Sequence, residues 1–184
     1  MALPLYQIPF VAVTSFGTLI AHFAYGVSAW CAQLSLSVFF TFFLGTRLLL
    51  VWRPPGNLAG LLLRLAAIVT LSGIVMLGFG HSLVLLMVAL AVLGIPHGLV
   101  YPVSLSLVAR GTISPDLSKA KSVLFAAASC VSLVIPLVLG VFATYLGYRE
   151  ILFIIFIPVA VLLFRIGVPN MLAASCGNQT SPQL

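Results

Sequence analysis

The sequence alternates between long apolar runs and short polar breaks. The breaks, at residues 25–26, 53–57, 80–81, 110–119 and 147–149, are rich in Gly, Pro and basic residues. An apolar run of ~20 residues is long enough to cross the roughly 30 Å hydrocarbon core of a bilayer as a helix. The pattern therefore predicts six transmembrane helices, at residues 3–24, 28–51, 58–79, 82–108, 120–146 and 150–168.

Helices are the expected form of these runs because a segment in lipid must satisfy its backbone hydrogen bonds within itself. We predict an all-α fold, a polytopic membrane protein with one six-span domain at residues 1–168. Residues 169–184 are small and polar, and we expect them to form a disordered cytoplasmic tail.

The composition agrees with a membrane protein. Hydrophobic residues make up 62% of the chain and charged residues only 5%, whereas soluble domains carry roughly a quarter of charged residues. The surface must therefore face a lipid bilayer. The formal net charge of +6 is spread over short breaks without a basic stripe, which argues against a nucleic-acid partner. The three cysteines lie far apart and form no Cys/His cluster, so we expect no disulfide, metal site or cofactor.

Basic residues predict the orientation, because cytoplasmic loops carry an excess of Lys and Arg. Of the eight basic residues, only Arg149 falls on the other side of the predicted bundle. We expect an integral protein of the plasma membrane with both termini cytoplasmic. The basic residues on the cytoplasmic side are Arg47, Arg53, Arg64, Arg110, Lys119, Lys121 and Arg165.

The fourth run holds the strongest candidate for chemistry. His97, Tyr101 and Ser104 are spaced i, i+4, i+7 and share one helical face. A histidine near mid-membrane is costly, so a functional role is a fair hypothesis. The alternative is that His97 and Tyr101 only hydrogen-bond a neighbouring helix. Because Lys121 and Glu150 lie only at the ends of the predicted spans, His97 is the mid-span group able to change charge near neutral pH.

Small residues and prolines predict how the helices pack. Gly94 and Gly98 permit close approach by another helix. Pro96 and Pro102 predict a bent or locally opened fourth span. Pro136 and Gly140 lie on a small-residue face of the fifth span, suited to packing or flexing.

Two further spans carry polar stripes. Thr18 and His22 share a face of the first span near its outer end and are candidates for solute contact. In the second span, polar residues at positions 33, 37 and 41 favour a packing seam over a substrate face. The acids, Asp116 and Glu150, lie in loops, and we find no protease, water-channel or phosphate-loop motif. We therefore expect no enzymatic activity.

Several segments together resemble a known family. Gly94-Ile95-Pro96-His97-Gly98-Leu99-Val100-Tyr101-Pro102 is similar to the tenth span of transporters of the major facilitator superfamily (MFS). Residues 114–122, 146–149 and 47–53 are similar to loops of the same family. Over residues 3–168 the chain resembles the carboxy-terminal six-helix half of an MFS transporter.

This resemblance implies an MFS half-bundle in which spans one and four line a central cavity, two and five flank the seam between halves, and three and six lie outside. It implies a half-unit of a secondary transporter that moves a small solute by alternating access, with a second six-span half as a separate chain or a homodimer. The alternative is a non-transporting membrane scaffold or subunit. A cytoplasmic hinge loop would contact the other half through Arg110, Asp116, Lys119 and Lys121.

Overall fold

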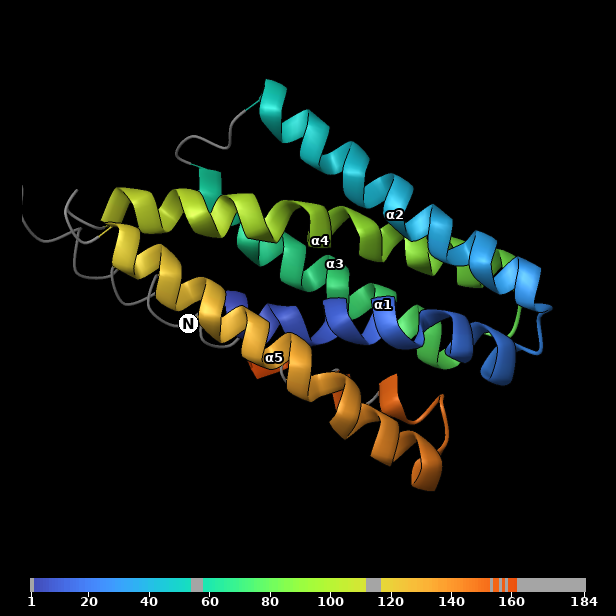
Figure 1. Cartoon of the computed structure of the whole chain (residues 1–184). Coiled ribbons are helices and arrows are strands. Elements are labelled where there is room, and N and C mark those ends of the chain that lie inside the picture. Colours follow the sequence, from blue (N-terminus) through green and yellow to red (C-terminus); the bar gives the residue numbers. More distant parts are fainter. Residues whose placement is uncertain are drawn as a thin grey trace, which may run out of the picture.

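The computed structural model describes residues 2–53, 58–111, 117–152, 154, 155, 157 and 159–161. These residues form an all-helical bundle (Figure 1). The helices are α1 (Ala2–Tyr25), α2 (Ala29–Trp52), α3 (Ala59–Phe79), α4 (Leu83–Gly111) and α5 (Leu117–Leu146). All five are long and apolar enough to cross a membrane. The prediction of an all-α, polytopic integral membrane protein is confirmed.

The sixth predicted span, 150–168, falls largely outside the described residues. Its described positions between 151 and 161 are helical, and a full sixth span stays a prediction. The tail at 169–184 and Asp116 also lie outside the described residues.

The loop between α4 and α5 is shorter than the predicted hinge loop. α4 continues through Arg110 and α5 already includes Lys119 and Lys121, so these residues belong to helix ends. The apolar run marks only the part of a helix within the hydrocarbon core, whereas backbone hydrogen bonding continues into the polar interface. The basic side chain of Lys119 is exposed and that of Lys121 is half-buried.

α4 occupies the centre of the bundle. It packs along α2 and α3, and α1 packs against α5 and α2. Successive helices run antiparallel, so the start of α1, the end of α2, the end of α4 and the start of α5 all lie towards the same end of the bundle (Figure 1). We call this the cavity end. Tight turns join helices at the other end, where Gly26 and Gly147 have positive φ angles of 66° and 101°, a conformation that side chains disfavour.

Two glycines bring α2 and α4 into close contact. A Cβ atom on Gly94 would lie 2.5 Å from the Phe39 carbonyl oxygen, and one on Gly98 would collide with the Phe43 carbonyl one turn further on. This spacing of four residues is the small-residue pattern of close helix pairs in membranes. α4 stays helical through Pro96, so the locally opened helix that we expected is not present.

Apolar side chains are exposed over much of the outer surface. Leu48 on α2 is 65% exposed, and Leu137 and Val141 on α5 are 69% and 58% exposed. In water such a surface would promote aggregation, but in a bilayer these side chains meet lipid tails. The buried core lies inside, around Phe39 and Leu93, both fully buried.

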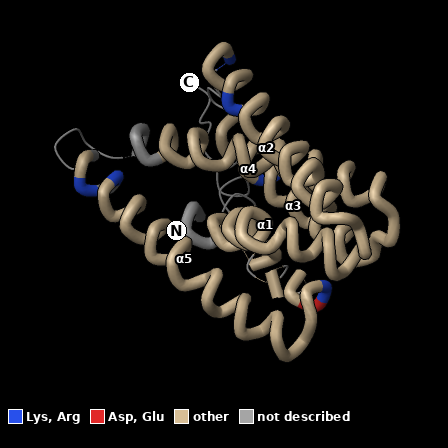
Figure 2. The backbone as a smooth tube through the Cα atoms, turned by 45° about the vertical axis from the view of Figure 1, so that its right-hand side comes forward, with Lys and Arg blue, Asp and Glu red and all other residues tan. Residues whose placement is uncertain are grey.

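The end opposite the cavity end is held by polar contacts around Arg149. This residue follows α5, and its guanidinium donates a hydrogen bond to the Gly80 carbonyl and lies 3.3 Å from His81 Nδ1. Tyr25 at the end of α1 donates to the Leu77 carbonyl at 2.7 Å, and its ring lies 5.8 Å from the Arg149 guanidinium carbon. Glu150 follows Arg149 directly in the chain, and Figure 2 shows an acidic segment beside a basic one at this end. We call these contacts the Arg149 cluster.

Candidate functional site

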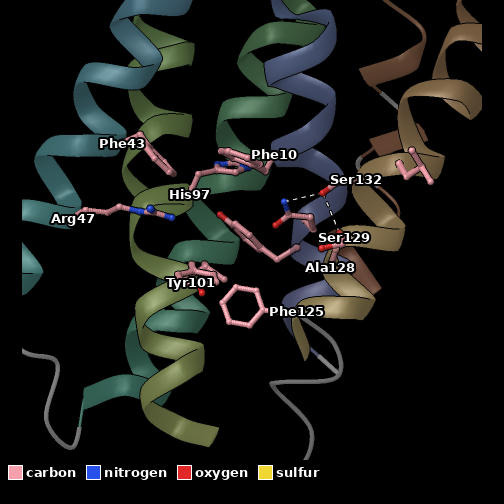
Figure 3. A pocket seen from close by; sticks show the side chains of 13 residues that line it. Phe10, Phe43, Arg47, His97, Tyr101, Phe125, Ala128, Ser129 and Ser132 are labelled. Atoms are coloured by element: carbon pink, nitrogen blue, oxygen red, sulfur yellow. Dashed lines mark hydrogen bonds between the residues drawn. The ribbon is translucent and has the colours of Figure 1, made fainter. Parts of the chain in front are cut away.

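A cavity of about 520 Å³ lies between α1, α2, α4 and α5. Its lining comes from the first half of α1, the second half of α2, the middle of α4 and the first half of α5, so it extends from mid-bundle towards the cavity end (Figure 3). No described residue of α3 lines it. The lining residues are Tyr6, Gln7, Phe10, Phe43, Arg47, His97, Val100, Tyr101, Phe125, Ala128, Ser129, Ser132 and Leu133.

His97 lies at the inner wall of this cavity. It is only 4% exposed, and its ring centroid lies 4.9 Å from that of Tyr6, 5.8 Å from Phe10 and 5.6 Å from Phe39. His97 Nδ1 is 2.6 Å from the Leu93 carbonyl oxygen. Because a carbonyl only accepts, this contact assigns the ring hydrogen to Nδ1. His97 Nε2 is buried and has no hydrogen-bond partner among the described residues, so it is an unused acceptor in the neutral ring.

Arg47 enters the cavity from α2. Phe39, Phe43 and Arg47 are spaced by four residues and share one helical face. The Arg47 guanidinium carbon lies 4.3 Å from the Phe43 ring centroid and 5.4 Å from that of Tyr101, within cation–π range. Arg47 Nε is buried and makes no hydrogen bond with any described residue. A second cavity of about 290 Å³ also borders Arg47 and Tyr101.

Other polar groups at the cavity are already paired. Gln7 Nε2 on α1 donates to Ser132 Oγ on α5 at 3.2 Å, and Ser132 Oγ donates to the Ala128 carbonyl at 3.0 Å. Thr70 Oγ1 on α3 donates to its own helix at 2.8 Å, so it accepts from the Tyr6 hydroxyl. These bonds fix the walls, and His97 Nε2 and Arg47 Nε are the buried lining atoms without a partner among the described residues.

Of the five residues that the sequence suggested for solute contact, the structure places two in the cavity lining and three outside it. His97 and Tyr101 line the cavity together. Ser104 is 7% exposed and lies outside the lining, with its Oγ unpaired among the described residues. Thr18 and His22 lie in the other half of α1, and His22 Nδ1 is 2.7 Å from the Val27 carbonyl oxygen at the surface. The cavity does not include these three residues.

Sequence reasoning missed Arg47 as a cavity residue. The family resemblance placed it in a loop motif at residues 47–53, although the predicted second span, 28–51, already included it and α2 continues to Trp52. The signal was present, because four apolar residues follow Arg47 before the break, at positions 48–51. Gln7 was also overlooked, although a glutamine inside an apolar run is a candidate for a buried contact. The aromatic lining, Phe10, Phe43 and Phe125, gave no such signal because phenylalanine occurs throughout the spans.

No protein-family model and no curated protein sequence matches this chain. Its structure is similar to the crystal structure of a mutant of the peptide transporter POT in complex with alafosfalin, with a TM-score of 0.75 at 12% sequence identity. The match covers 90% of this chain and 36% of that one. The chain therefore spans about a third of the length of this solved protein and shares its fold over that part.

Proposed function

We propose that this chain is a half-unit of a secondary transporter that moves a small solute across the membrane by alternating access. The observation that carries this proposal is the cavity of about 520 Å³, lined by Arg47 and His97, each with a buried nitrogen that is unpaired among the described residues. Concave sites with a few polar groups at mid-membrane depth are where transporters bind solutes. The likeness in fold to a peptide transporter supports the same function.

A second six-span half would cover exposed polar groups on α2. Gln33, Ser37 and Thr41 are all exposed, and the two hydroxyls donate back to their own helix at 3.1 and 2.8 Å. A Cβ on Gly45, in the same row, would have no described heavy atom within 4 Å. Lipid tails cannot hydrogen-bond to such a face, whereas another helix could pack closely and hydrogen-bond there. This row supports a partner half, as a separate chain or a second copy.

The orientation belongs to the same proposal. The basic residues at the ends of α2, α4 and α5 would place the cavity end at the cytoplasmic face of the plasma membrane. Arg149, beside Glu150, would then lie outside. The cavity would receive or release its solute on the cytoplasmic side.

Uptake measurements test the transporter proposal. Host cells that lack the gene and cells that carry it on a plasmid are compared with radiolabelled dipeptides and small organic acids. We expect saturable uptake that depends on the chain and falls in His97→Gln, while Leu137→Ala on the lipid-facing side of α5 keeps it. A chain that assembles with another membrane protein but supports no uptake would instead be a scaffold subunit.

A further inference from the structure

We propose that the cavity selects an organic carboxylate with an apolar or aromatic body and a hydroxyl or amide N–H donor. This inference rests on the proposed function and names the chemical class of its solute. Arg47 would bind the carboxylate, His97 Nε2 would accept the donor hydrogen, and the aromatic lining would hold the body.

Arg47 has the donors for this role. A guanidinium carries five N–H groups in a planar fork that matches the two oxygens of a carboxylate. Its contacts with Phe43 and Tyr101, at 4.3 and 5.4 Å, hold the charge in place without consuming any donor. Figure 3 shows the Arg47 side chain extending from α2 towards the centre of the lining. The charge is thus positioned but not hydrogen-bonded through Nε.

No carboxylate of the described chain neutralises Arg47. The sequence has only two acids. Glu150 lies beyond the end of α5 in the Arg149 cluster region, whereas Arg47 lies towards the cavity end. Asp116 lies outside the described residues. A cation half-buried in an apolar bundle is costly without a counter-ion. A carboxylate solute would supply the missing charge.

The rest of the lining selects the body of the solute. His97 Nε2 needs a hydrogen from a donor, because its partner nitrogen is already bonded to the Leu93 carbonyl. Phe10, Phe43 and Phe125 offer apolar ring surface. The volume of about 520 Å³ is within the usual range of small-molecule pockets. A cationic solute would be repelled by Arg47, and a small inorganic anion would leave the rings uncovered.

Matched probes test the charge and the donor separately. We would measure binding to the purified full chain in detergent by equilibrium dialysis, with 4-hydroxybenzoate, its neutral analogue 4-hydroxybenzamide, and benzoate, which lacks the donor. We expect 4-hydroxybenzoate to bind at least about tenfold tighter than the amide, equivalent to about 1.4 kcal/mol. Benzoate should fall between them. Equal affinities for the acid and the amide would overturn the inference.

Arg47→Gln should abolish the preference for the acid, and Arg47→Lys should retain part of it. Arg53→Gln is the control. Arg53 is an exposed arginine at the end of the same helix, so this substitution removes the same charge away from the cavity. Asp116→Asn should leave binding unchanged. A tenfold gain in that variant would show that Asp116 already occupies the guanidinium, which would contradict the inference. Gel filtration establishes that each variant is folded.

Uptake of the same probes separates this inference from the transporter proposal. Selective binding of 4-hydroxybenzoate without uptake in cells would reject transport and keep the carboxylate site. Uptake with no preference between acid and amide would keep transport and reject the carboxylate site.

Discussion

The two arginines at opposite ends of the bundle have different surroundings. Each lies near an aromatic ring, Arg47 at 4.3 Å from Phe43 and Arg149 at 5.8 Å from Tyr25. Arg149 donates to the Gly80 carbonyl and thereby joins the α3–α4 turn to the segment after α5. Arg47 borders a cavity instead, and both arginines keep an unpaired Nε among the described residues.

Arginine serves two purposes in this bundle, one structural and one in binding. A charge that is bonded to backbone across helices holds a structure together, because the bond is lost when the helices separate. A charge that faces a cavity contributes little to folding and remains available to a ligand. The Arg149 cluster should therefore matter for stability, and Arg47 should matter for binding.

The largest effect should come from Gly98→Leu. A side chain here would collide with the Phe43 carbonyl and with Thr46 Cβ at 3.0 Å, and backbone cannot move aside as a side-chain end can. We expect destabilisation at or beyond the upper end of the usual overpacking cost, about 3 kcal/mol, with loss of the cavity wall that Arg47 completes. Thermal melts in detergent measure it.

For the monomeric chain in detergent, with no partner half bound, Gly45→Leu on α2 is the control, because nothing described lies within 4 Å of its Cβ position. It should keep the melting temperature of the parent. A Gly98→Leu protein as stable as Gly45→Leu would show that α2 and α4 are not held at the described distance.

The next largest effect should be the difference in stability between variants of the two arginines. Arg149→Gln removes the hydrogen bond to the Gly80 carbonyl, and bonds to charged groups contribute about 1.5–3 kcal/mol. We expect the melting temperature to fall by several degrees. Arg47→Gln should change it little. If Arg47→Gln were the more destabilising variant, the assignment of Arg47 to ligand binding and Arg149 to stability would be reversed.

A third prediction concerns His97 and uptake. His97→Gln keeps a polar group of similar length but cannot gain a charge. We expect uptake to fall about tenfold, which corresponds to about 1.4 kcal/mol, because the acceptor nitrogen Nε2 is lost from the cavity wall. His22→Gln, at the surface of α1 and away from the cavity, is the matched control. Unchanged uptake in His97→Gln would remove His97 from the transport site.

The sequence predicted the helices well, because bilayer thickness dictates the length of an apolar run. The second span was predicted at 28–51 and α2 covers Ala29–Trp52. Helical spacing alone also placed His97 and Tyr101 on one face, and both line the cavity.

The position of Arg47 required tertiary structure. Which face of α2 turns inward depends on how its backbone fits against Gly94 and Gly98, and that fit is not visible in the sequence of α2 itself. Likewise, Gln7 and Ser132 are separated by 125 residues, so nothing local indicates their contact. Periodicity assigns faces within a helix, but only packing decides which faces meet.

The smallest predicted effect tests the wall that Gln7 and Ser132 form between α1 and α5. Gln7→Ala removes one neutral hydrogen bond, of 3.2 Å, and such bonds contribute about 0.5–1.5 kcal/mol. Ser132 keeps its bond to the Ala128 carbonyl at 3.0 Å, so no buried donor is left unpaired, and we expect the low end of that range. Ser129→Ala, at an exposed lining position on α5, is the control.

Because α5 contacts the rest of the described bundle chiefly through α1, loosening this bond should also widen the cavity. A Gln7→Ala protein with the same melting temperature as Ser129→Ala would contradict the wall as described.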